Sequence, residues 1–145
     1  MLTLYESHAG WFHLEFADDI PYFVGDPAQL RQVMHNLLQN AQDSLADVSE
    51  PRITVRSERT EGGIRVTITD NGAGFPETLM KRAFEPYVTT KPKGTGLGLV
   101  IVKKIVEEHN GTVGISNVSP HGARVTLTFS TLAAQKPAPR AAANA

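Results

Sequence analysis

The chain has 145 residues, of which 41% are hydrophobic, and a formal net charge of −1 from 14 basic and 15 acidic side chains. This length suits one domain with a proper core. The near-neutral charge, with no cluster of Lys and Arg, argues against a nucleic-acid partner. The lack of cysteine excludes a disulfide framework and cysteine-bound metal, and no apolar run approaches the length of a membrane span.

The N-terminal third predicts two short strands and a long helix. The apolar segments 13–16 and 22–24 are separated by a turn-forming Asp-Asp-Ile-Pro sequence. Asp26 is a suitable helix cap, the proline after it favours the first turn, and Gln29 completes a predicted capping box. The helix extends to about residue 45, because apolar side chains recur at helical spacing at Leu30, Val33, Met34, Leu37, Leu38, Ala41 and Leu45.

Two hairpins are predicted further along the chain. Apolar and polar residues alternate over 53–55 and again over 64–68, with Gly62-Gly63 between them. The same alternation returns over 113–115 and 125–129. Each pair of strands is therefore expected to place one face on a core.

The hairpins are separated by two predicted helices. A short helix is expected over 76–83, and a longer one over 97–109 ends at Asn110-Gly111, which predicts a left-handed cap. This order predicts an α+β fold, a two-layer sandwich with a mixed sheet and helices on one face. Residues 1–132 form the predicted domain, and the Ala- and Pro-rich residues 133–145 are expected to be a disordered tail.

Three segments suggest a nucleotide site. Asp70-Asn71-Gly72-Ala73-Gly74 follows a predicted strand, Gly94-Thr95-Gly96-Leu97-Gly98-Leu99 opens a predicted helix, and Asn36 and Asn40 lie one helical turn apart. Alone, the first segment also fits a tight turn and the second a ligand-free helix entry. Together, a carboxylate, two glycine loops and two amides are what a purine, a triphosphate and Mg²⁺ require.

These residues resemble the catalytic domain of histidine kinases. Residues 36–41 look like its N box, 70–74 its first glycine box, Phe84-Glu85-Pro86-Tyr87 its F box and 94–99 its second glycine box. The superfamily also includes gyrase, MutL and heat-shock chaperone ATPases, and its fold is the Bergerat type. The run from Tyr87 to Lys91 is most similar to sensor kinases of the nitrogen-regulation type.

The resemblance implies a role for each matching residue around ATP. Asp70 would accept a hydrogen bond from the exocyclic amine of adenine, and Gly72 and Gly74 would let the backbone approach the purine. Asn40 would ligate Mg²⁺, although helix amides that only bond each other remain an alternative for both asparagines. The phosphates would lie on the second glycine box, whose implied nucleotide-binding residues are Gly94, Thr95, Gly96, Leu97, Gly98 and Leu99.

A mobile lid over residues 75–96 is expected to cover the nucleotide and to become ordered when it binds. Phe84 would anchor this lid, an interpretation close to plain packing of a loop on the core. Lys91 or Lys93 would contact the γ-phosphate, and each is equally credible as a solvated lysine. The catalytic roles implied by the resemblance fall on Asn36 and Lys91.

Two absences define the expected mechanism. Members that hydrolyse ATP carry a glutamate where this chain has Asn36, and a neutral amide is not a general base, so direct hydrolysis should be poor. None of the five histidines has the context of a phosphoacceptor. The chain therefore looks like a fragment that needs dimerisation and phosphoacceptor helices from the rest of its protein, without autophosphorylation in isolation.

Some positions depart from the family pattern. Asp43 stands where many members carry Lys or Arg, and Gly122-Ala123 lacks the threonine of the late Gly-Thr box. Other functions stay open: a serine kinase of the anti-sigma type, or an ATP-sensing interaction module without catalysis. The expected partners are ATP or ADP and, indirectly, a response regulator receiver domain, with no nucleic acid and no membrane contact by this fragment. The expected location is the cytoplasmic part of a longer sensor.

Overall fold

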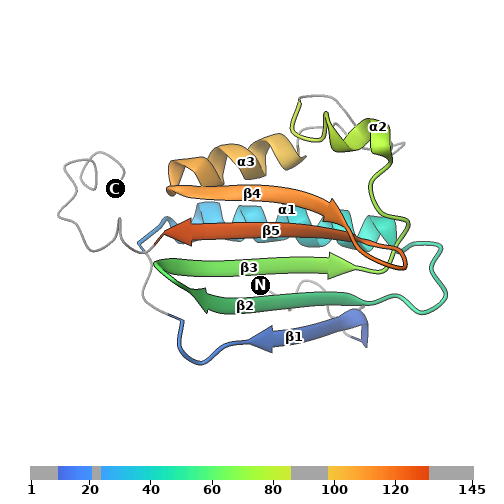
Figure 1. Ribbon diagram of the computed structural model, residues 1–145, viewed down its shortest axis with the longest axis horizontal. Helices are drawn as coiled ribbons and strands as arrows, with labels where there is room; N and C mark the ends of the chain where they lie inside the picture. The colour runs from blue at the N-terminus through green and yellow to red at the C-terminus, as the bar shows by residue number, and fades with distance from the viewer. Residues whose placement is uncertain (1–9, 21–23, 86–97, 131–145) are drawn as a thin grey trace.

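The computed structural model describes residues 10–20, 24–85 and 98–130. It is a two-layer α+β sandwich, in which α1 and α3 lie side by side against one face of a five-stranded sheet (Figure 1). The elements in chain order are β1 (Phe12–Phe16), α1 (Pro27–Ser44), β2 (Ile53–Thr60), β3 (Gly63–Asp70), α2 (Glu77–Met80), α3 (Gly98–Glu108), β4 (Gly111–Asn117) and β5 (Ala123–Ser130).

The sheet is mixed, as the sequence predicts. Its strand order is β1-β2-β3-β5-β4, with β1 parallel to β2 and all other neighbours antiparallel. Both predicted hairpins are confirmed, because β2 pairs with β3 and β4 pairs with β5. Gly62 takes a φ of 88° in the first of these turns, a conformation that favours glycine.

The core lies between the sheet and the two long helices. Along β5, every second side chain is buried while Arg124 between them is exposed, the period-two pattern of a strand with one covered face. Helices α1 and α3 meet this face with one apolar stripe each. The most deeply buried of the large side chains are Leu37, Leu38, Leu45, Ile53, Leu127, Val33, Val102 and Val106.

The start of α1 confirms one predicted contact and corrects another. Asp26 is the helix cap, and its Oδ1 accepts hydrogen bonds from the backbone N–H groups of Ala28 and Gln29. The predicted capping box is wrong, because the Asp26 N–H donates to Nε2 of His109 at 3.0 Å instead of to Gln29. The antiparallel packing of α3 on α1 brings His109 to this position, which sequence spacing does not reveal.

Other boundaries differ less. The predicted helix over 76–83 is helical only from Glu77 to Met80, after which tight turns, with Arg82 N–H bonding Leu79 O, carry the chain to buried Ala83. Asn110 takes the predicted left-handed conformation, with a φ of 60°. Residues 22 and 23 of the second predicted strand and the predicted tail lie outside the described residues. In the part of the chain that the structure describes, no helix has the length and apolarity needed to cross a membrane.

Candidate functional site

Three of the sequence motifs meet at one end of the sandwich, where β3 and α1 end and α3 begins (Figure 1). A Cβ on Gly72 would lie 2.8 Å from the carbonyl oxygen of Ser44, so the loop after β3 touches the end of α1. Asn36 Nδ2 donates to the carbonyl of Gly98 at 3.4 Å, which joins α1 to the start of α3. The fold thus assembles segments that are far apart in sequence.

Asp70 is the buried carboxylate of this site, with 8% of its surface exposed. Its Oδ1 accepts hydrogen bonds from the backbone N–H of Gly72 at 2.9 Å and of Ala123 at 3.3 Å. A buried charge is costly unless such donors satisfy it. The two backbone donors therefore hold Asp70 in one orientation at this end of the sandwich.

The glycines after Asp70 are required by the protein's own packing. Gly72 lies against Ser44, and an added Cβ would also be 3.2 Å from Asp70 Oδ1. Gly74 has a φ of 84°, and its Cβ would meet Asn117 Oδ1 at 2.8 Å and the Gly122 carbonyl oxygen at 2.9 Å. Close approach of these glycines to a purine stays a prediction, because their contacts with protein atoms are reason enough for glycine.

Two asparagines and a glycine near the site make structural contacts that sequence reasoning does not reveal. Asn117, at the end of β4, accepts from Phe75 N–H at 2.7 Å and donates to the Phe75 carbonyl at 2.9 Å, which fixes the chain leaving the first glycine loop. Asn71 spans the start of β2 in the same way, bonding Arg52 N–H and the Glu50 carbonyl. Gly122 lies directly against the Asp70 backbone. The sequence signal for these residues is weak, since an Asn or Gly at a strand end marks many ordinary turns.

Both N-box asparagines face the start of α3, as their spacing predicts. Asn36 is half-buried, and its Oδ1 also accepts from Gln32 Nε2 at 2.8 Å. Asn40 is half-buried too, and its Nδ2 is 3.9 Å from the place of a Cβ on Gly98. The alternative interpretation, amides that bond each other within the helix, holds for Oδ1 of Asn36, which accepts from Gln32, and not for its Nδ2, which bonds α3.

The residues present fit a magnesium ion that is held mainly by phosphates. Among residues 10–20, 24–85 and 98–130, no three His, Asp or Glu side chains gather into a metal site. Mg²⁺ keeps several waters and is commonly bound by one or two protein oxygens together with substrate phosphates. Asn40, whose side-chain amide lies beside the start of α3, carries an oxygen that suits that mode.

Several predicted site residues cannot be placed. Lys91, Lys93, Gly94, Thr95, Gly96 and Leu97 lie outside the described residues, as does most of the second half of the predicted lid. The remaining members of the second glycine box open α3, where Gly98 is half-buried and Leu99 packs against the core.

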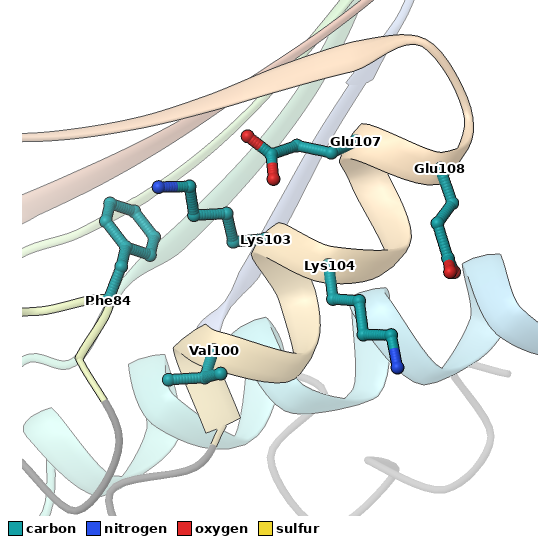
Figure 2. A pocket seen from close by; sticks show the side chains of 6 residues that line it. All are labelled: Phe84, Val100, Lys103, Lys104, Glu107 and Glu108. Carbon is teal, nitrogen blue, oxygen red and sulfur yellow. The ribbon is translucent and has the colours of Figure 1, made fainter.

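Phe84 lies on the outer side of α3, at a pocket of about 400 Å³ that Figure 2 shows. The Nζ of Lys103 is 5.6 Å from the centroid of the Phe84 ring, a cation–π distance. Neither Asn40 nor Asp70 lines this pocket, whose walls are Phe84, Val100, Lys103, Lys104, Glu107 and Glu108. Phe84 thus lies against α3, while its predicted roles as a lid anchor and as a nucleotide contact stay predictions.

The chain matches a known family over this fold and site. The family of histidine kinase-, DNA gyrase B-, and HSP90-like ATPases matches residues 25–132. A putative sensor histidine kinase NtrY-like of Rickettsia bellii is 47% identical over 107 residues, which are 74% of this chain and 18% of that protein. Sensor histidine kinase ZraS of Escherichia coli O157:H7 is 38% identical over 110 residues, 76% of this chain and 24% of that protein.

A solved structure agrees with these relatives. The catalytic domain of histidine kinase ThkA, in a nucleotide-free form, superposes with a TM-score of 0.78 at 29% identity, covering 89% of this chain and 86% of that one. The present chain spans less than a quarter of the length of the two curated relatives described above. Together with the geometry of Asp70, Asn36 and α3, these matches show that the chain belongs to the histidine kinase-, DNA gyrase B-, and HSP90-like ATPase family, as a catalytic ATP-binding domain of the sensor histidine kinase type.

Proposed function

We propose that this domain binds MgATP and transfers the γ-phosphoryl group to a histidine on a dimerisation helix supplied by another part of its protein, within a two-component signalling system. One observation carries the proposal: Asp70, the N-box asparagines and the start of α3 meet at one end of the sandwich. The relatives named as sensor histidine kinases support the same conclusion.

Each end of the nucleotide has a matching group in this chain. Asp70, oriented by Gly72 and Ala123, accepts the exocyclic amine of adenine. The triphosphate lies at the N-terminus of α3, where backbone N–H groups and the helix dipole favour anions, with Lys91 or Lys93 as further contacts. Asn40 supplies an oxygen ligand to Mg²⁺, which stabilises the charge of the transferring group.

The chemistry needs an imidazole from outside this chain. Its nitrogen forms a bond to the γ-phosphorus as the bond to the bridging oxygen breaks and ADP leaves. This chain's residues bind and orient ATP for that displacement, and they offer little for hydrolysis. Asn36 is a neutral amide whose two ends bond Gln32 and Gly98, so it cannot activate water as a general base.

The wider context follows from the same proposal. The domain extends over residues 1–132, in the cytoplasmic portion of a longer sensor, and the phosphoryl group passes from the histidine to a response regulator receiver domain. We propose no nucleic-acid partner and no membrane contact for this chain.

The test is reconstitution with labelled ATP and the dimerisation helices encoded with this chain. Label that appears on the helices, is lost in acid and is stable in base identifies phosphohistidine and supports the proposal. Acid-stable label on serine would support the anti-sigma type of kinase instead. ATP binding without any transfer would leave the ATP-sensing interaction module as the better description.

A further inference from the structure

His109 connects the far ends of the two long helices, away from the candidate site. It directly follows α3, and its Nε2 accepts a hydrogen bond from the Asp26 N–H at 3.0 Å. Its Nδ1 is 2.8 Å from the carbonyl oxygen of Ile105. A backbone N–H can only donate, so Nε2 must be unprotonated and the ring proton must sit on Nδ1, where it donates to Ile105.

This contact ties the two antiparallel helices together at one end. At the other end, Asn36 Nδ2 donates to the Gly98 carbonyl. Gly98 and His109 are separated along α3 by roughly 16 Å at about 1.5 Å per residue. Between the two ties, α1 and α3 contribute buried apolar residues such as Val33 and Val102, and apolar burial is non-directional. The directional bonds therefore select how far α3 is shifted along α1.

The shift matters because it sets the position of the start of α3. Asn40 Nδ2 is 3.9 Å from the place of a Cβ on Gly98, so a small slide of α3 changes the space between them. Asp70, in contrast, is held by Gly72 and Ala123 on the sheet side of the site. The tie at His109 therefore acts on the end of the site near Asn40 and leaves the Asp70 end unchanged.

We propose that His109 is a positioning residue for phosphate binding, which acts through its acceptor bond from the Asp26 N–H to hold the start of α3 against Asn40. The inference rests on the proposed function, because it needs the phosphates of MgATP to lie between Asn40 and α3. The same inference places the adenosine part of the ligand at Asp70, whose position does not depend on the hydrogen bond between His109 and Asp26.

Two polar variants distinguish the roles of the two ring nitrogens of His109. In His109→Gln, the side-chain oxygen reaches the place of Nε2 and keeps an acceptor for the Asp26 N–H. In His109→Asn, the shorter side chain offers polar atoms only near the place of Nδ1, so the tie to Asp26 is lost. His13→Leu, at an exposed histidine of β1, is the control for removing a histidine elsewhere.

The experiment titrates all four proteins with MgATP and with adenosine, followed by NMR chemical shifts. Because a net hydrogen bond is worth a modest free energy, His109→Asn should weaken MgATP binding by about threefold to tenfold and change adenosine binding by less than about twofold. His109→Gln and His13→Leu should bind both ligands like the unmodified chain. The ring ¹⁵N shifts of His109 should show a protonated Nδ1 and an unprotonated Nε2.

Three results would overturn the inference: equal MgATP affinity for the Asn and Gln variants, equal losses for MgATP and adenosine, or a proton on Nε2. If His109→Asn does not fold, the Gln variant and the ring tautomer still test the inference. Loss of MgATP affinity in His109→Gln would contradict the role of Nε2 as the acceptor. Failure of the proposed nucleotide site looks different, since the unmodified chain would then bind neither ligand, and failure of phosphotransfer alone would leave both affinities unchanged.

Discussion

Single contacts around Asp70 show how a buried carboxylate is held in one orientation at the candidate site. Backbone N–H groups from Gly72 and Ala123 converge on one oxygen, and the Gly122 backbone lies directly behind Asp70. Ala123 contributes its backbone N–H to Asp70, while the side-chain hydroxyl of the threonine in the late Gly-Thr box is absent at this position. We propose that Asp70 selects adenine, since guanine presents a carbonyl where adenine presents an amine.

Gly72 gives the sharpest stability prediction at this scale. A Cβ there would lie 2.8 Å from a backbone oxygen of Ser44, so Gly72→Ala should destabilise the fold by about 1–3 kcal/mol, as overpacking does. Gly114→Ala is the matched control, because a Cβ on Gly114 meets nothing within 4 Å. It should be neutral or stabilise by up to about 1 kcal/mol. Urea unfolding measures both, and equal effects would contradict the packing argument.

Asn40 carries a prediction about activity instead of stability. Asn40→Ala removes the proposed oxygen ligand of Mg²⁺, so phosphotransfer to supplied dimerisation helices should fall by at least about a hundredfold. The melting temperature should move little, because the residue is only half-buried. Gln39→Ala, at an exposed neighbour that bonds Asp43, serves as the control and should keep its rate. A rate like that of the unmodified chain for Asn40→Ala would refute the metal-ligand role.

At the scale of elements, α1 connects the sheet, the candidate site and α3. Its cap faces His109, its middle presents Asn36 and Asn40 to Gly98, and its last turn contacts the loop at Gly72. One helix thus contacts both the start of α3 and the loop after β3, the two segments to which we assign the phosphates and the base. The N-terminus of α1 contacts His109 and its C-terminus contacts the loop at Gly72, so substitutions at the two ends can be tested separately.

The cap of α1 predicts a defined loss of stability. Asp26→Ala removes the acceptor for the N–H groups of Ala28 and Gln29 and should cost about 1 kcal/mol. Asp26→Asn retains a capping oxygen and should be nearly neutral. Both keep the backbone N–H that bonds His109, so neither should alter the ligand preference. Equal unfolding free energies for the Ala and Asn variants, measured by urea denaturation, would show that the cap contributes nothing.

Local patterns predict elements well here, and long-range contacts poorly. Alternation over 53–55, 64–68 and 125–129 identifies the central strands, because one covered face imposes a period of two. The capping box fails because a residue 83 positions away from Asp26 takes its N–H. The predicted helix over 76–83 is too long, because tight turns follow Met80 and carry the chain to buried Ala83.

For the whole molecule, the sequence motifs predict where the site lies. The reason for each residue in them becomes clear only from its contacts in the fold. The glycines at 72 and 74 were expected to admit a purine, and the structure gives them partners in Ser44 and Asn117. The parallel pairing of β1 with β2 could not be predicted, because alternation does not specify which strands become neighbours. What the sandwich adds is one end where β3, α1 and α3 meet, as Figure 1 shows.

The central claim is that this end of the sandwich is an adenine-nucleotide site in which Asp70 recognises the base. Calorimetric titration of the 145-residue chain with MgATP and with MgGTP tests it most directly. We expect saturable binding of MgATP and an affinity for MgGTP at least about tenfold lower, because a charge-assisted hydrogen bond to Asp70 is lost. Asp70→Asn should weaken MgATP binding by roughly tenfold or more, with Asp47→Asn as an exposed control. Equal affinities for MgATP and MgGTP, or no binding of either, would contradict the account.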